Sequence, residues 1–149
     1  MTPDMIIPDL SEQEYESAGR KFAKAGAHLS ECGMPEWETP GQSIRFPFRI
    51  IEEGEDNGKE NKLVAGVSKS GIWKFKEMEK ALGLQLMKSV DGKMTIQEAG
   101  LMACVGKQFQ SVWTTQTDSR TPEEGGKGGT YTKPTSALPV GAKIEDLGI

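Results

Sequence analysis

The alternation of hydrophobic and polar positions is clearest over residues 43–50, where every second side chain is large and apolar. The apolar members of this stretch are Ile44, Phe46, Phe48 and Ile50. A period of two predicts a β-strand that turns these side chains to a core and places Arg45 and Arg49 on the opposite face. Pro47 has no backbone N–H to donate, so we expect the strand to lie at a sheet edge or to have one unpaired position.

A helical period is clearest over residues 70–82, where apolar side chains recur every three or four positions. Gly83 follows where a glycine commonly ends a helix. Trp73 lies beside the apolar stripe, and we expect it in the core. A Ser-x-x-Glu capping pattern that begins at Ser11 predicts another helix over residues 11–24.

Shorter patterns predict the other elements. Strands are expected at 27–31, 63–67, 108–116 and 131–138, a hairpin within 84–94, and a helical turn over 95–103 opened by a second capping pattern at Thr95. Loops are expected at 32–41, 52–59 and 119–130, the last of them flexible by composition. About five short strands with a helix between the third and fourth are typical of an OB-type barrel.

The sequence therefore predicts a mostly β fold with one main helix: an OB-like five-stranded Greek-key barrel with an extra N-terminal helix. Residues 1–25 form the N-terminal lead and helix in this interpretation, residues 26–138 form the OB-like domain, and residues 139–149 form a tail that frays.

Composition fits one domain of modest core size, because the 149 residues are 36% hydrophobic and 27% charged. The 18 glycines and 8 prolines favour short elements and many turns. No apolar run approaches the roughly 20 residues of a membrane-spanning helix. The first ten residues contain no basic region of the kind that opens a signal peptide. We therefore expect a cytoplasmic protein, with no membrane partner and with Cys32 and Cys104 as reduced thiols.

The formal net charge of −4 argues against a histone-like nucleic-acid binder. Acidic residues are concentrated in the first 60 positions, whereas the rest of the chain has more bases than acids. This asymmetry fits a protein with one side that faces a polyanion. It fits equally two ordinary solvated faces.

Residue patterns for catalysis are lacking. His28 is the single histidine, with Ser30 and Cys32 nearby, and a structural role is its commoner use. His28, Cys32 and Cys104 lack the paired spacing of a zinc site. Residues 66–71 lack the spacing of a phosphate-binding loop. We expect no enzymatic activity, no metal and no cofactor.

Basic and aromatic side chains predict a nucleic-acid-binding face instead. Arg45 and Arg49 are separated by about 13 Å along an extended strand, which suits two phosphates or two stacked bases. Trp113, on a polar strand, is a candidate for base stacking, and Trp37 is either a stacking surface or a plug over one barrel end. The alternative for the arginines is solubility and edge protection. Residues that would extend the face are Lys62, Lys69, Lys107, Tyr131 and Lys133.

The chain resembles a family of small phage proteins encoded among replication and recombination genes. The resemblance covers about residues 26–138. The stretches that carry it are the strand at 43–48, the acidic Gly-Lys turn, the helix at 73–78 that closes at 81–83, and the segments 105–107 and 131–133. It implies an OB-like fold and single-stranded-DNA binding in phage DNA metabolism.

The favoured hypothesis is a non-catalytic single-stranded-DNA-binding protein in the cytoplasm of an infected bacterium. A phage or host replication or recombination protein and a second copy of the chain are further candidate partners. Two alternatives stay open. One is a protein-interaction module, such as a phage inhibitor of a host factor, that uses Trp37 and the acidic residues 52–60. The other is a structural component of the virion or its assembly.

Overall fold

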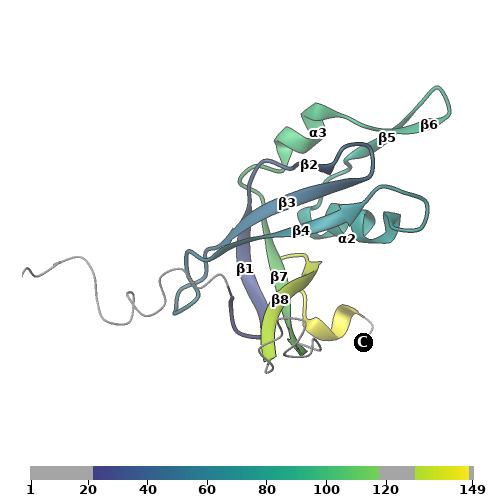
Figure 1. Cartoon of the computed structure of the whole chain (residues 1–149). Helices are drawn as coiled ribbons and strands as arrows, with labels where there is room; N and C mark the ends of the chain where they lie inside the picture. The colour runs from purple at the N-terminus through teal and green to yellow at the C-terminus, as the bar shows by residue number, and fades with distance from the viewer. Residues whose placement is uncertain (1–21, 118–129, 148–149) are drawn as a thin grey trace, which may run out of the picture.

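The computed structural model describes residues 22–117 and 130–147, and β-strands are their main secondary structure (Figure 1). The elements are β1 (Gly26–Cys32), β2 (Glu36–Thr39), β3 (Ser43–Ile50), β4 (Glu60–Gly66), α2 (Ile72–Leu82), β5 (Met87–Val90), β6 (Lys93–Ile96), α3 (Glu98–Ala103), β7 (Gln108–Thr117), β8 (Thr130–Leu138) and the 3₁₀-helix η2 (Ile144–Leu147). The mostly β prediction is confirmed, as are the strands expected around 27–31, 43–50, 63–67, 108–116 and 131–138.

Strand β3 is the centre of an antiparallel sheet. It pairs with β4 along its length, from Ser43 opposite Gly66 to Arg49 opposite Glu60. Its other edge is shared, because β2 pairs with the first half of β3 and β1 with the second half. Beyond β1 the sheet continues through β7 to β8. Helix α2 packs against both β4 and β8, and within the described residues no strand pairing joins these two strands.

Pro47 lies where β3 changes partner. The chain bends between β1 and β2, and the amide of Gly33 at this bend donates to the carbonyl of Pro47 at 2.8 Å. Pro47 pairs with Lys62 of β4, but neither β1 nor β2 lies in register with it on the other edge. The strand therefore tolerates a residue without an N–H, because neither β1 nor β2 is in register with this position on that edge.

The core forms on the face of the sheet that carries the apolar alternation of β3. Phe46 meets Phe75 of α2 with ring centroids 5.9 Å apart. Phe48 meets Phe109 and Trp113 of β7 edge-on, at 5.6 Å and 6.2 Å. Such tilted and edge-to-face contacts are favoured between aromatic rings. The stripe predicted for α2 also turns inward, and its buried members are Phe75, Met78, Ala81 and Leu82.

Two turns use the backbone freedom that their residues allow. Gly83 ends α2 with φ +69°, in the left-handed region where glycine is favoured. Asp91 and Gly92 join β5 to β6 with φ +52° and +80°, as a two-residue hairpin turn requires. This hairpin projects away from the main sheet (Figure 1).

Some predicted elements differ from the structure. The loop expected at 32–41 contains β2, which the sequence did not reveal. The helix start predicted at Thr95 is wrong. Thr95 lies in β6, and α3 begins after Gln97. The helix expected over 11–24 lies outside the described residues except for residues 22–24, which are not helical. The loop expected at 119–130 also lies outside them, apart from Thr130 in β8.

Residues 139–142 open the tail that the sequence predicts to fray, and two of their carbonyls contact strand β7. Nε2 of Gln110 in β7 donates to the carbonyls of Pro139 and Ala142, at 2.9 Å and 2.7 Å. These two bonds hold the segment against the sheet after β8 ends.

Candidate nucleic-acid interface

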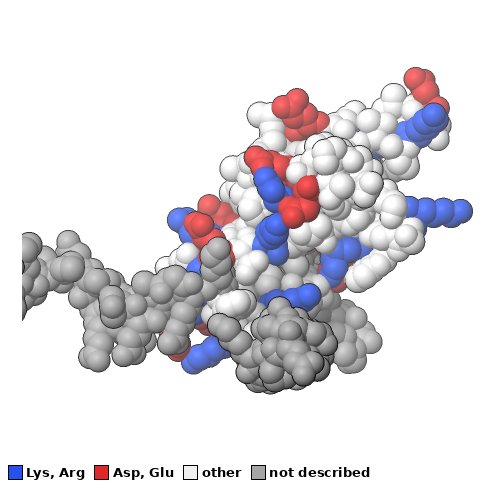
Figure 2. All heavy atoms as spheres, viewed as in Figure 1, with Lys and Arg blue, Asp and Glu red and all other residues white. Residues whose placement is uncertain are grey.

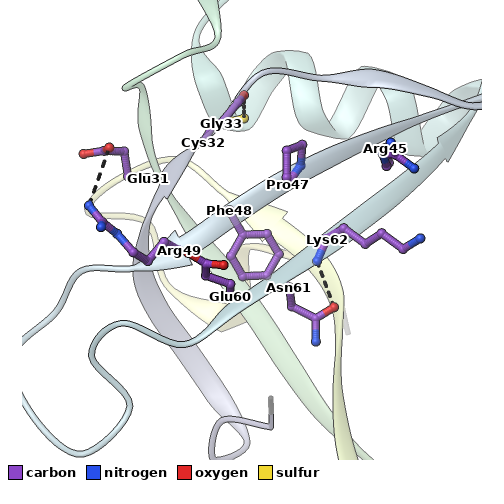
Figure 3. A pocket seen from close by; sticks show the side chains of 10 residues that line it. All are labelled: Glu31, Cys32, Gly33, Arg45, Pro47, Phe48, Arg49, Glu60, Asn61 and Lys62. Atoms are coloured by element: carbon purple, nitrogen blue, oxygen red, sulfur yellow. Dashed lines mark hydrogen bonds and ion pairs between the residues drawn. The ribbon is translucent and has the colours of Figure 1, made fainter. Parts of the chain in front are cut away.

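A cleft of about 610 Å³ lies over the outer face of β1, β3 and β4 (Figure 3). The alternation of β3 that buries its phenylalanines turns Arg45 and Arg49 outward, and Lys62 of β4 joins them. The lining residues are Glu31, Cys32, Gly33, Arg45, Pro47, Phe48, Arg49, Glu60, Asn61 and Lys62. Three of the predicted site residues, Arg45, Arg49 and Lys62, are thus brought together.

The hollow follows from the bend between β1 and β2. At Gly33 the chain leaves the line of β1 and lies over Pro47. A Cβ at position 33 would meet the Pro47 ring at 3.4 Å. Gly33 and Pro47 both line the cleft at this bend.

Acidic side chains neutralise much of the cleft. Arg45 donates to the carboxylates of Glu36 at 2.5 Å and Glu38 at 3.4 Å. Lys62 donates to the other oxygen of Glu38 at 2.7 Å. The hydrogen bond from Lys62, with Arg45 alongside, lowers the pKa of Glu38. The hydrogen bonds to Glu36 and Glu38 in turn raise the pKa of Arg45.

Arg49 is the least constrained of the three cations. Its guanidinium lies 4.0 Å from the carboxylate of Glu31, at the limit of an ion pair, and about half of its side chain is exposed. Figure 2 shows basic and acidic side chains interspersed on the visible face, without a large surface of one sign. The site therefore offers alternating charges with Arg49 as its most available cation.

The structure does not bring the other four residues that were expected to extend the face into this cleft. Lys69 lies in the connection from β4 to α2, and Lys107 lies directly before β7. Tyr131 and Lys133 lie on β8, which β1 and β7 separate from β3. The ring of Tyr131 packs edge-on against Phe22 at 6.4 Å. None of the four lines the cleft.

The expectations for two of the three tryptophans are wrong. Trp113 is 1% exposed, so it is not available to stack on a base in this structure; its Nε1 donates to Ser111 at 3.0 Å. Trp73, expected in the core, is instead 62% exposed. Trp37 on β2 is 43% exposed, which fits a partly open stacking surface better than a buried plug.

A signal for the exposure of Trp73 is present in the sequence. Lys76 and Lys80 follow Trp73 at three and seven positions, so the three residues share one side of a helix. That polar side lies away from the stripe through Phe75 and Met78, which the structure buries.

His28 has a structural setting. It is buried, its Nδ1 is hydrogen-bonded to the carboxylate of Glu52, and its Nε2 lies 2.6 Å from the carbonyl of Lys24. Both ring nitrogens thus lie against oxygen atoms of neighbouring groups. The ring joins the segment before β1 to the β3–β4 loop.

The two cysteines are buried free thiols. Burial, together with the neighbouring Cys104, raises the pKa of Cys32 to about 12. Burial also raises the pKa of Cys104 to about 11. Thiols in this state are poor nucleophiles and poor metal ligands, because both roles need the thiolate. Among the described residues, no three His, Cys, Asp or Glu side chains are grouped to hold a metal ion.

No protein-family model matches the sequence, and no curated protein matches it. The resemblance to small phage proteins thus stays a prediction. In the described part of the chain, no helix has the length and apolar character needed to cross a membrane.

Proposed function

We propose that the protein is a non-catalytic single-stranded-DNA-binding protein whose curled sheet is an OB-type barrel. The pairing order supports the barrel: β3 pairs with β1 and β4, and β1 pairs with β7, which pairs with β8. Counting the bent β1–β2 as one strand gives the main sheet five strands, apart from the β5–β6 hairpin, with α2 between the third and fourth in chain order, as in an OB fold. In the OB proteins that bind oligonucleotides, the sheet face and its loops carry the site.

The observation that carries the proposal is the cleft over β3 and β4, where Arg45, Arg49 and Lys62 line one open surface. Phosphates of an extended strand would meet Arg49 first, since its contact with Glu31 is the longest in the cleft. Arg45 and Lys62 would exchange a carboxylate for a phosphate oxygen. Ion pairs between exposed side chains add little net stability, so this exchange costs little.

A protein partner is the second candidate, and the ion-pair network favours it. Glu36, Arg45, Glu38 and Lys62 form a continuous chain of alternating charges. Trp37 pairs with the core-facing Ile44, so it lies on the opposite face of β2, where it is 43% exposed. Aromatic and arginine side chains are enriched in protein interfaces. An inhibitor of a host factor or a component of virion assembly would use strand β2, with the ion pairs on one face and Trp37 on the other.

A salt-dependent titration tests the DNA proposal. The binding of a labelled oligothymidylate of about 30 nucleotides is followed by fluorescence anisotropy for the full chain and for the double variant Arg45→Gln with Arg49→Gln. The matched control is Lys88→Gln with Lys93→Gln, which removes the same charge from exposed positions on the β5–β6 hairpin.

We expect the arginine pair to weaken binding and to reduce the slope of log K against log salt by about 1.4, since each phosphate contact to single strands contributes about 0.7. The hairpin control keeps the wild-type slope. Equal affinities for the arginine variant, the control and the wild type would mean that this cleft does not bind the DNA.

A further inference from the structure

A second groove, of about 620 Å³, lies between helix α2 and the end of β8. This volume is in the range of small-ligand sites. Ala137, Leu138 and Pro139 supply its apolar side, and both Ala137 and Leu138 are buried. The segment after β8 completes the wall through Ala142.

The wall of this groove is held in place. Gln110 reaches from β7 to the carbonyls of Pro139 and Ala142, with Nε2 distances of 2.9 Å and 2.7 Å. On the other side, the Lys74 ammonium group donates to the carbonyl of Thr135, which ties α2 to β8. The groove therefore exists in the protein before any ligand arrives.

Helix α2 presents one aromatic ring and two cations to this groove. Trp73, Lys76 and Lys80 follow one another at i, i+3 and i+7 and so share one face of the helix. Lys76 and Lys80 are one turn apart, about 6 Å along the helix axis. This rise is comparable with one nucleotide of an extended strand.

The charge here differs from that of the β3 cleft. Glu77 is the acid among the lining residues, and the ammonium group of Lys74 holds its carboxylate at 2.9 Å. The same ammonium group lies 4.8 Å from the centroid of the Trp73 ring. Lys76 and Lys80 are exposed and have no acidic partner within the described residues. The groove thus combines a 62% exposed indole with two unneutralised cations.

We propose that this groove is a stacking site for single-stranded DNA, with a base on the Trp73 indole and phosphates at Lys76 and Lys80. The proposal rests on the proposed function and adds a contact surface that the β3 cleft does not contain. Every base offers a π-face, so one exposed indole beside a pair of cations binds single strands without reading their sequence. In a duplex the bases are already stacked on one another and are not available to the ring.

Four variants of the full chain test this site in the same anisotropy titration. Trp73→Ala removes the stacking surface, and its control is Met102→Ala, which removes another exposed apolar side chain from α3. Lys76→Gln with Lys80→Gln removes the two cations, and Lys88→Gln with Lys93→Gln is its charge-matched control. All substituted positions are exposed, so the fold is expected to persist, and thermal unfolding checks this for each variant.

We expect Trp73→Ala to weaken binding by about 5- to 150-fold, the range for one stacked base. The lysine pair should lower the salt slope by about 1.4. If the wild type binds while both groove variants behave like their controls, the groove is not a site, although the protein still binds DNA. If the wild type fails to bind single strands even at low salt, both this site and the proposed function are wrong.

Discussion

Removal of the Asp56 carboxylate is expected to destabilise the protein strongly, because Asp56 connects two parts of the chain. Asp56 lies in the loop between β3 and β4 and is 7% exposed. One of its oxygens accepts from the ammonium group of Lys59 at 2.7 Å, and the other accepts from the amide of Lys24 at 3.2 Å. The Lys59 ammonium also donates to the carbonyl of Phe22 at 2.9 Å. The loop thereby holds the segment that leads into β1.

The magnitude follows from what Asp56→Ala leaves behind. Two hydrogen bonds to a charged group are lost, each worth about 1.5–3 kcal/mol. The Lys59 side chain is 11% exposed, and within the described residues its ammonium group keeps the hydrogen bond to the Phe22 carbonyl but loses its carboxylate partner. Loop relaxation and water entry recover part of the free energy lost with these hydrogen bonds. We therefore expect Asp56→Ala to lower the free energy of unfolding by about 3 kcal/mol.

Low pH should weaken the hydrogen bonds that Asp56 accepts from Lys59 and Lys24. Burial opposes ionisation of Asp56, but the hydrogen bonds from Lys59 and Lys24 and the nearby positive charges together outweigh it, so the pKa of Asp56 is lowered. A lowered carboxyl pKa contributes stability that is present above the unfolded value of about 3.9 and is lost as pH falls through the folded value. The stability difference between wild type and Asp56→Asn should therefore shrink below about pH 4.

Urea unfolding at several pH values, followed by tryptophan fluorescence, measures both effects. Glu53→Ala is the control, since Glu53 is exposed in the same loop and should change the free energy of unfolding by less than about 0.5 kcal/mol. The reasoning is refuted if Asp56→Ala costs no more than this control, or if the Asp56→Asn difference does not depend on pH.

Two further predictions concern the core. Cys32 and Cys104 should react with a thiol reagent at pH 8 only after unfolding, because both are buried and their pKa values are raised to about 12 and about 11; rapid labelling of the native protein would contradict this. Phe46→Ala should lower the free energy of unfolding in urea by about 3–5 kcal/mol, because Phe46 is fully buried against Phe75; a loss below about 1 kcal/mol would place the ring outside the core.

Sequence patterns predicted the elements whose side chains follow one clear period. The alternation of β3 and the stripe of α2 specify their buried faces directly, and Asp91-Gly92 specifies its turn. Strand β2 was missed because it is four residues long and pairs only after β1 bends at Gly33. Its register with β3 could not be seen in the local pattern.

The same limit explains the error at Trp113 and the ion pairs of the cleft, which the sequence pattern did not show. Trp113 has polar neighbours in the sequence, but Ser111 turns inward with it and accepts from its Nε1. Ser111 also bonds Ser30 of β1 at 2.8 Å, so the polar groups satisfy one another inside the core. Arg45 was predicted on a nucleic-acid-binding face without any sign of its ion pair, because only the β2–β3 pairing places Glu36 opposite it. Both results depend on contacts between strands rather than on local periodicity.

The most direct test of the central claim is an anisotropy titration of the wild-type protein with a single-stranded oligonucleotide and with the matching duplex, at low and moderate salt. The account predicts that the single strand binds at low salt, that added salt weakens this binding, and that the duplex binds far less. An absence of single-strand binding at low salt, where electrostatic attraction is strongest, would contradict it.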